Sequence, residues 1–314
     1  MAASPRVDVH HHFYPPEYFE LLRGGTGVAG ANLAGIGQWT PAATLEEMDR
    51  NGVTTAILSL SPPGPRGADP AAARRLARIC NEYGARMCRN HPGRFGLFAP
   101  VPMPDIDGTL IEIEYALDVL GADGIELTTS YRDTWLGDPR FDPVMDELNR
   151  RKAAVFVHPL APDCCAGLID WVPASLIEFP HDTSRAILSL MFGGTLDRLP
   201  DIRFIFYHAG GTIPMLAGRI KQSGANRPFL AKVPKGIDHE LKKLHYDIAL
   251  AASRPSLLAL FDYVPMSQIL LGSDYPFASV GASLEGLEAM GLPPEQVQAI
   301  HAGNARRLLP RLSG

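Results

Sequence analysis

The sequence predicts a single closed (β/α)8 barrel, the TIM-barrel architecture, and three features carry that prediction. Eight short runs rich in β-branched and aromatic residues recur along the 314 residues, patterns typical of helices separate them, and the runs are almost continuously apolar. Continuous apolar character is typical of strands covered on both faces, as in parallel sheets. Eight such strands alternating with helices favour the closed barrel over an open doubly wound sheet, which stays the alternative.

The elements follow from local patterns taken in chain order. The strands are expected at residues 7–10, 55–60, 94–101, 123–128, 153–158, 202–208, 245–250 and 268–274. The first helix between two strands should begin at Thr40-Pro41, an N-cap followed by a first-turn proline, and stop at Gly52. Further helices are expected at 70–87, 107–120, 143–151, 183–196, 214–222 and 255–261.

Residues 14–38 are rich in glycine and show few helix signals, so we expect a long loop or lid after the first strand. No internal repeat or low-complexity tract divides the chain. Barrels of this kind reach this length as one unit, and residues 1–314 are therefore predicted to be one domain.

Composition limits the classes of partner. Apolar residues make up 46% and charged residues 20% of the chain, as in globular proteins, and no apolar run approaches the length of a membrane span. The chain has a net charge of −5, whereas proteins that bind nucleic acid usually carry an excess of basic residues. The N-terminal residues enter a strand without the apolar region of a signal peptide. We expect a cytoplasmic protein that acts on small molecules, with no nucleic-acid or membrane partner.

The four cysteines form no recognisable framework. Cys80 and Cys88 lie in a predicted helix, where buried structural thiols are common, and Cys164-Cys165 lies in a predicted loop. Their spacing fits neither a disulfide framework nor a zinc-binding Cys-x-x-Cys pair. We expect structural roles for all of them.

Three successive histidines end the first predicted strand. Side chains alternate along a strand, so His10 and His12 point to one side and His11 to the other. An expression tag would be longer and would not continue an apolar strand. Two imidazoles on one side suit a metal ion, but two ligands rarely hold a catalytic metal alone, so further ligands must come from elsewhere.

Other strand ends supply the missing groups. In a barrel, the carboxyl ends of all strands meet at one mouth, which is where active sites lie. His158 ends the fifth predicted strand, His208 the sixth and Asp274 the eighth. A histidine at one strand end is usually structural, but four imidazoles and a carboxylate at the same rim predict a metal site.

Several motifs, in matching order along almost the whole chain, resemble the amidohydrolase superfamily. The branch that the sequence resembles is named for aminocarboxymuconate-semialdehyde decarboxylase and includes decarboxylases of hydroxybenzoates and 6-methylsalicylate. The motifs are Asp8-Val9-His10-His11-His12, His158-Pro159, His208-Ala209-Gly210-Gly211, Ser273-Asp274-Tyr275-Pro276-Phe277 and Gly303-Asn304-Ala305.

The resemblance implies that His10, His12, His158 and Asp274 hold one divalent metal ion, zinc by expectation and manganese as the alternative. It also implies that His208 is an unligated acid–base or substrate-orienting group beside the metal, and either His208 or Asp274 is expected to supply the proton in catalysis. Members with two metals generally need a bridging lysine or glutamate on the fourth strand. Residues 123–129 contain no lysine, and Glu126 should lie short of the rim. One metal is therefore expected.

The resemblance also suggests how a substrate is held. An arginine at the place of Arg219 reaches into the neighbouring subunit in the family and binds a substrate carboxylate, which implies a homodimer; a surface arginine is the other interpretation. The name-giving enzymes carry an arginine shortly before residues 38–41, but none lies between Arg23 and Arg50 here. An aromatic monocarboxylate is therefore favoured over an aliphatic substrate with several carboxylates.

Aromatic side chains near the predicted rim could enclose such a ring, although each alone is more often a packing residue. They are Phe13, Tyr14, Trp39, Tyr131, Trp135, Trp171 and Phe277, of which Phe13, Trp39, Tyr131 and Phe277 are our predicted substrate contacts.

The expected activity is metal-dependent, non-oxidative decarboxylation of a hydroxylated or methylated benzoate. One alternative keeps the site and changes the reaction to hydrolysis of a lactone, ester or amide by a metal-bound water. A second alternative is a binding protein with a structural metal, but structural zinc sites are usually closed and rich in cysteine.

Overall fold

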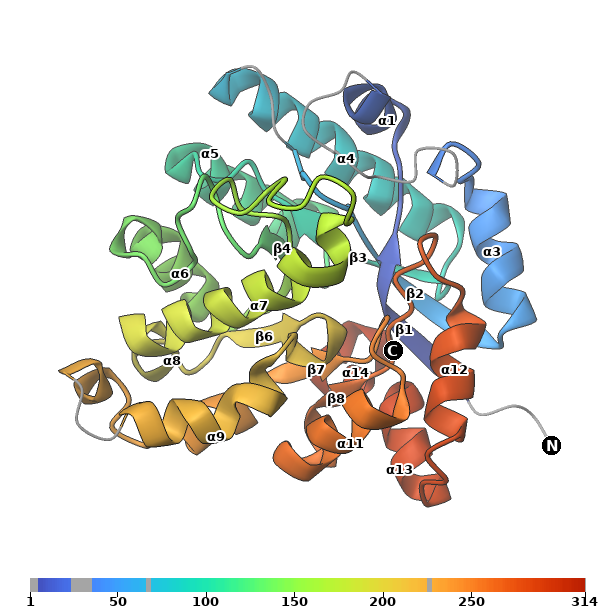
Figure 1. The fold of residues 1–314 in the computed structure, drawn as a ribbon. Coiled ribbons are helices and arrows are strands. Elements are labelled where there is room, and N and C mark those ends of the chain that lie inside the picture. The colour runs from blue at the N-terminus through green and yellow to red at the C-terminus, as the bar shows by residue number, and fades with distance from the viewer. Residues whose placement is uncertain (1–4, 24–35, 66–68, 225–227, 314) are drawn as a thin grey trace.

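The computed structural model describes residues 5–23, 36–65, 69–224 and 228–313, and it forms the barrel that the sequence predicts (Figure 1). One parallel sheet carries all eight strands in the order of the chain. The strands are β1 (Arg6–His12), β2 (Val53–Ser59), β3 (Phe95–Pro100), β4 (Gly124–Thr128), β5 (Ala154–His158), β6 (Arg203–Phe206), β7 (His245–Asp247) and β8 (Ile269–Leu270).

Backbone hydrogen bonds between β1 and the segment after β8 close the sheet. The Val9 amide donates to the Leu271 carbonyl (3.0 Å), and the His12 amide donates to the Tyr275 carbonyl (2.8 Å). Between them, the Asp274 amide donates to the His10 carbonyl (2.9 Å). The regular part of β8 is shorter than predicted because the chain bends, with Asp274 in the left-handed region at φ 68°. The open-sheet alternative is therefore wrong.

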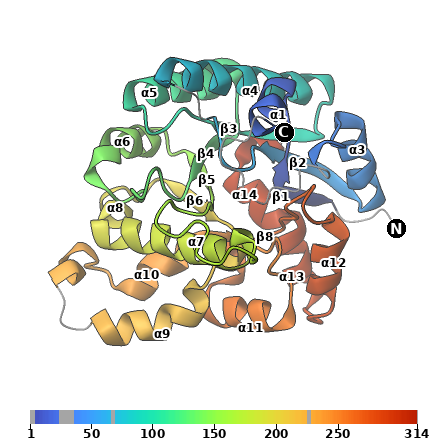
Figure 2. The same ribbon diagram turned by 45° about the horizontal axis from the view of Figure 1, so that its top comes forward.

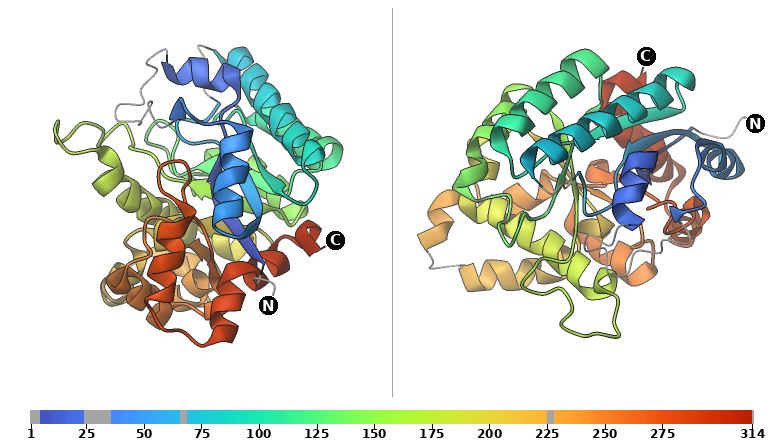
Figure 3. Two further views of the ribbon diagram at one scale, coloured as in Figure 1. Left: turned by 90° about the vertical axis from the view of Figure 1, so that its right-hand side faces the viewer. Right: turned by 90° about the horizontal axis from the view of Figure 1, so that it is seen from above.

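Helices surround the strands on the outside of the barrel (Figures 2 and 3). They are α1 (Pro16–Arg23), α3 (Pro41–Arg50), α4 (Pro70–Asn90), α5 (Ile106–Glu114), α6 (Asp142–Arg150), α7 (Ala174–Gly193), α8 (Thr195–Arg198), α9 (Ile213–Gly224), α10 (Ile237–Lys242), α11 (Arg254–Tyr263), α12 (Val280–Glu288), α13 (Pro294–Gln298) and α14 (Asn304–Leu308). No helix in the described ranges is long and apolar enough to span a bilayer.

The predicted start of the first helix between two strands is confirmed. The Thr40 side chain accepts a hydrogen bond from the Ala43 amide (3.0 Å), and Pro41 occupies the first turn of α3. Asp69 caps α4 in the same way by accepting from the Ala72 amide (2.7 Å). Each cap satisfies an amide that has no partner within the helix.

Among the helices, two regions differ most from the prediction. Residues 14–38 were expected to form a loop, but Pro16–Arg23 folds as α1, because Tyr18 and Leu22 lie four residues apart and bury one face. Within that segment, residues 24–35 lie outside the described residues. Helix α7 begins at Ala174 rather than near residue 183, and it tolerates Pro180 in its interior.

Candidate metal centre

Four side chains from three parts of the chain converge at the mouth of the barrel. His10 and His12 come from β1, His158 ends β5 and Asp274 follows β8. One ligand atom from each lies within 4.8 Å of the others, and all four residues are buried. The sequence placed these same four residues at the strand ends.

The spacing of the donor atoms fits one small cation. The two Nε2 atoms of His10 and His12 lie 3.3 Å apart. The Oδ1 atom of Asp274 lies 3.0 Å from each of them. Ligands that surround a tetrahedral zinc ion at its usual distances lie about 3.3 Å from one another. Three imidazoles and a carboxylate thus form a donor set that a single divalent metal could occupy.

A separate hydrogen bond orients each histidine ring. The Nδ1 atom of His10 lies 3.0 Å from Asp247 Oδ2, and that of His12 lies 3.3 Å from the Ser59 carbonyl oxygen. The Nδ1 atom of His158 lies 2.6 Å from the Pro159 carbonyl oxygen. Acceptors at Nδ1 hold the proton there and leave Nε2 free to bind a metal, which is how proteins orient histidine ligands.

Asp247 is a site residue that the sequence did not reveal. It ends β7 fully buried, and its Oδ1 atom accepts hydrogen bonds from the amides of His208 (3.1 Å) and Ala249 (2.9 Å). The predicted strand ran on to residue 250, so Asp247 did not stand at a strand end. An aspartate inside an otherwise apolar run was the available signal.

The electrostatics of the site favour a positive charge at its centre. Burial opposes the ionisation of Asp274, but the nearby His10 and the hydrogen bonds from His10 and His12 hold the pKa of Asp274 well below its usual range. Burial also opposes a charge on His10, yet the carboxylates of Asp274 and Asp247 raise the pKa of His10 to about 10. A metal ion would take the place of the proton on His10.

The other two imidazoles remain neutral, as ligands must. Burial lowers the pKa of His12, and it lowers the pKa of His158 well below the usual value, with His12 and His10 adding to the shift. Each ring can therefore offer a lone pair at Nε2.

His208 stands beside the four ligands without joining them. Its ring stacks on His10, with centroids 5.5 Å apart, and its Nε2 atom lies 3.5 Å from Asp274 Oδ2. That distance is too long for a strong hydrogen bond. The side chain keeps 10% of its surface exposed, so it can meet a molecule that enters the mouth.

A strained turn aims the His208 side chain. His208 (φ 49°) and Ala209 (φ 58°) lie in the left-handed region, which costs free energy for residues other than glycine. Gly211 follows at φ 64°, and a Cβ atom there would lie 2.0 Å from the Pro180 carbonyl oxygen of α7. The two glycines of the His208-Ala209-Gly210-Gly211 motif thus allow β6 to turn sharply beneath α7.

Aromatic side chains lie around the ligands. Beneath them, His10 stacks on the buried ring of Tyr207, with centroids 3.9 Å apart. Phe277 meets the edge of His12 at 5.7 Å and is 39% exposed, so it lies at the mouth. Trp39 packs edge-on against Tyr14 at 5.9 Å.

Tyr14, rather than Phe13, lies near the metal ligands. Burial raises the pKa of the Tyr14 phenol well above its usual value, and the carboxylates of Asp274 and Glu126 add to the rise. Phe13 is fully buried and stacks on Tyr83 of α4, with centroids 6.3 Å apart. The predicted substrate contact of Phe13 needs correction, because strand alternation turns its ring outwards, toward the helices.

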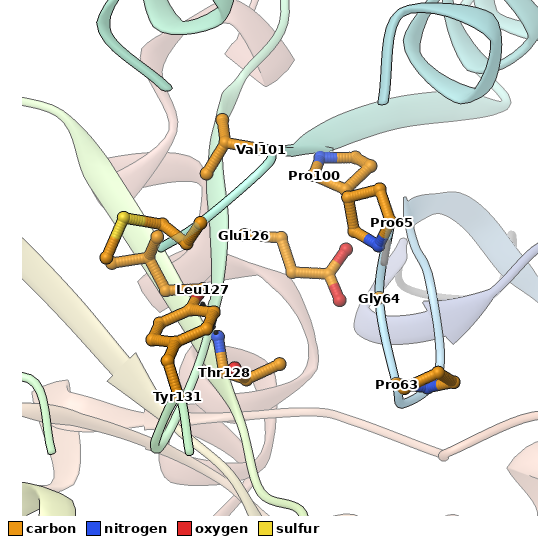
Figure 4. Close-up of a pocket in the computed structure, with 10 residues that line it drawn as sticks. Pro63, Gly64, Pro65, Pro100, Val101, Glu126, Leu127, Thr128 and Tyr131 are labelled. Carbon is orange, nitrogen blue, oxygen red and sulfur yellow. Dashed lines mark hydrogen bonds between the residues drawn. The ribbon is translucent and has the colours of Figure 1, made fainter. Parts of the chain in front are cut away.

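Tyr131 and Glu126 line a small cavity after β2, β3 and β4 (Figure 4). The Tyr131 hydroxyl accepts a hydrogen bond from the Thr128 amide (3.0 Å), and Glu126 Oε2 accepts one from the Leu60 amide (2.8 Å). Burial raises the pKa of Glu126 well above its usual value. The Glu126 carboxyl group points into the cavity toward the loop at Gly64. It is not among the four grouped ligand residues.

The remaining predicted residues lie further out. His11 faces away from the ligands, as expected, with its Nδ1 atom 2.9 Å from Asp8 Oδ2 and its ring stacked on Tyr275. Arg219 is exposed on α9. The role of Arg219 at a neighbouring subunit stays a prediction.

Comparisons with known proteins agree with this geometry. The model of the amidohydrolase family matches residues 7–311. A 6-methylsalicylic acid decarboxylase of Aspergillus aculeatus is 37% identical over 98% of this chain and 96% of its own length. Another, from Penicillium expansum, is 36% identical over 98% of this chain and 97% of its own.

Solved structures share the fold. An amidohydrolase structure superimposes with a TM-score of 0.88 at 29% identity, covering 97% of this chain and 99% of that one. A dihydroxybenzoic acid decarboxylase from a Polaromonas species, with bound manganese and an inhibitor, superimposes with a TM-score of 0.85 at 21% identity, covering 98% and 97%. The chain therefore belongs to the amidohydrolase family, in the branch to which the 6-methylsalicylic acid decarboxylases belong.

Proposed function

We propose that this protein is a metal-dependent, non-oxidative decarboxylase of a small aromatic carboxylic acid of the hydroxybenzoate or 6-methylsalicylate type. The observation that carries the proposal is the pairing of a three-histidine, one-aspartate ligand set with an acid–base residue, His208, that stays outside it. The 6-methylsalicylic acid decarboxylases that match nearly the whole chain support this choice of substrate class.

One divalent metal ion would be held by His10, His12, His158 and Asp274. When bound, it would supply positive charge that attracts the substrate carboxylate and a neighbouring ring oxygen. We propose zinc because imidazole-rich sets of four ligands suit it, with manganese as the alternative because the Polaromonas relative binds it.

The reaction exchanges the carboxyl group for a proton. The bond between the ring carbon and the carboxylate breaks, carbon dioxide leaves, and the ring carbon accepts a proton. His208 and Asp274 are the two groups placed to supply that proton, with Nε2 and Oδ2 3.5 Å apart at the open side of the ligand set.

Aromatic side chains would hold the ring of the substrate. Phe277 lies at the mouth, Trp39 and Tyr14 pack together after β1, and Tyr131 lies beside the cavity after β4. Apolar rings around the site would exclude water and so disfavour the hydrolytic alternative.

We propose further that the active unit is a homodimer in which Arg219 binds the substrate carboxylate in the neighbouring subunit. Arg219 and Met215 are both exposed and lie four residues apart on one face of α9. A dimer measured by light scattering would support this arrangement, and a monomer that retains full activity would contradict it.

The direct test of function is anaerobic turnover. The protein, loaded with zinc or manganese, should release carbon dioxide from 6-methylsalicylate or 2,6-dihydroxybenzoate and yield the matching phenol. The same protein is also assayed with aryl esters and lactones as substrates. Hydrolysis of these compounds without decarboxylation of any aromatic acid would overturn the proposal in favour of a hydrolase.

A further inference from the structure

Two cysteines outside the metal centre lie almost in bonding contact. Cys164 and Cys165 belong to the segment between β5 and α7, the yellow-green segment near α7 in Figure 1. Their Sγ atoms are 2.7 Å apart, about 0.7 Å more than the length of a disulfide bond. Cys164 is exposed and Cys165 is partly buried, so reagents in solution can reach the pair.

The other two cysteines provide an internal contrast. Cys80 is buried on α4, and burial raises the pKa of its thiol. Burial likewise raises the pKa of Cys88 to about 12. Thiols of this kind stay protonated and react slowly. Among the four cysteines, all of which lie in the described ranges, Cys164 is the exposed one and Cys165 is its direct neighbour, so reactivity is expected at this pair.

Charged groups distinguish the two sulfur atoms. Arg185 Nη2 of α7 lies 3.8 Å from Cys165 Sγ, so a positively charged side chain contacts this sulfur atom and not that of Cys164. Asp133 Oδ1 accepts a hydrogen bond from the Cys164 amide (3.0 Å), and its charge disfavours a second thiolate. The hydrogen bond between the two sulfur atoms raises the pKa of Cys164 to about 11, so Cys164 keeps its proton at neutral pH.

We propose that Cys164 and Cys165 form a redox-active vicinal dithiol that reduces low-molecular-weight disulfides and closes into a ring at the rim of the barrel. The Cys165 thiolate attacks one sulfur of the small disulfide, forms a mixed disulfide and releases one thiolate. Cys164 then loses its proton to solvent, its sulfur attacks Cys165 Sγ, and the second small thiolate leaves. Two protein thiols are oxidised by two electrons, and one disulfide is reduced to two thiols.

The ring should open easily. Adjacent Cα atoms lie about 3.8 Å apart, which is less than the Cα separation of ordinary disulfides. A strained and exposed disulfide is more readily reduced than a structural one. Closure would also disturb the hydrogen bond from the Cys164 amide to Asp133, which belongs to the loop that carries Tyr131.

The test uses the metal-loaded protein and oxidised glutathione, with intact-mass measurement and peptide mapping. The wild-type protein should lose the mass of two hydrogen atoms, carry no adduct and recover both thiols with dithiothreitol. Cys164→Ser and Cys165→Ser should each retain a glutathione adduct on the remaining cysteine. The rim pair should react at least about tenfold faster than Cys88.

Cys88→Ser is the matched control, because it removes a thiol elsewhere and should close the ring like the wild-type protein. Stable glutathione adducts on the wild-type pair would overturn the proposal, as would a disulfide between two protein chains. Failure of Cys164 and Cys165 to react faster than Cys88 would overturn it as well. None of these outcomes depends on which substrate the metal centre accepts.

Discussion

At the scale of single residues, the hydrogen bonds at Nδ1 are what turn three histidines into ligands. Asp247 has the strongest such contact, because its carboxylate faces His10 from β7 and also fixes the amide of His208. The acid–base residue and one ligand are thus held by the same side chain. A change at Asp247 should affect metal binding without touching any ligand.

We expect Asp247→Asn to weaken metal binding by roughly 10- to 100-fold. The asparagine oxygen can keep the amide bonds of His208 and Ala249, which both go to Oδ1, but its NH2 group would face His10 Nδ1. A donor there drives the His10 proton to Nε2, where it blocks the metal. Competition with a chelating dye measures the affinity, and Asp163→Asn in the segment after β5 is the control. Unchanged affinity would show that Asp247 does not orient His10.

Two histidine variants distinguish metal binding from acid–base catalysis. His158→Ala should lose the metal and the activity while circular dichroism shows an intact fold, because the ring is one of four ligands at a rim. His208→Gln should keep the metal and lose about a hundredfold or more in kcat, the usual contribution of a general acid. Metal analysis and turnover on the same samples check both. Metal loss in His208→Gln would place His208 among the ligands.

The sequence showed the ligands but not what orients them. His158 and Asp274 were predictable because each closes an apolar run, and barrel geometry brings strand ends together. The Ser59 and Pro159 carbonyl groups that orient the rings of His12 and His158 belong to the backbone. Every residue has such a group, so the sequence does not reveal these contacts. Phe13 and Tyr14 directly follow β1, and residue type alone does not show that the Phe13 ring packs against Tyr83 of α4.

At the scale of elements, the turn after β6 couples the barrel to α7. Gly211 lies where no side chain fits, directly against the Pro180 carbonyl group, and the turn carries His208. The structure of this turn, together with the hydrogen bond from the His208 amide to Asp247, sets the direction of the His208 ring.

Gly211→Ala should therefore destabilise the protein by roughly 2 kcal/mol or more, through both the positive φ and the clash. Gly218→Ala on α9 is the matched control, since nothing lies within 4 Å of its Cβ position and alanine favours a helix there by up to ~1 kcal/mol. Urea unfolding of both variants gives the two free energies. Equal stability of Gly211→Ala and the wild-type protein would contradict the close approach of α7.

Element boundaries were harder to predict than element types. The prolines and glycines of residues 14–38 concealed the short amphipathic pattern of α1. Pro180 suggested a later start for α7, yet the helix continues through it. Thr183 and Ser184 donate from their side chains to the carbonyl groups four residues earlier, within the same part of the helix. These bonds occupy carbonyl groups of the turn that contains Pro180, so the helix continues past the proline.

At the scale of the whole molecule, the alternation of strands and helices determined the architecture, and the sequence carried that pattern along its full length. What could not be predicted from it is how stability responds to solution conditions, because burial decides that response. Burial lowers the pKa of His245 and of His301 to about 4, whereas an unfolded histidine titrates near 6.5.

Because the unfolded chain binds more protons than the folded one between pH 4 and 6.5, stability should fall as the pH falls through that window. Each histidine contributes at most about 3 kcal/mol to this loss. His245→Asn cannot take up the proton, so its free energy of unfolding should change less with pH than that of the wild-type protein. Urea unfolding in metal-free buffer from pH 4 to 7 measures the slopes, with the exposed His239→Asn as control. Parallel slopes for all three proteins would exclude His245 as a source of acid sensitivity.

The central claim is that this barrel replaces an aromatic carboxyl group with a proton delivered at the metal centre. The most direct measurement is anaerobic turnover of 6-methylsalicylate by the metal-loaded protein in deuterium oxide, with the product examined by NMR and mass spectrometry. We expect carbon dioxide and 3-methylphenol with one deuterium at the ring carbon that carried the carboxyl group, and no product from His158→Ala. A product that gains oxygen, or an intact acid under conditions in which a lactone or ester is hydrolysed, would contradict it.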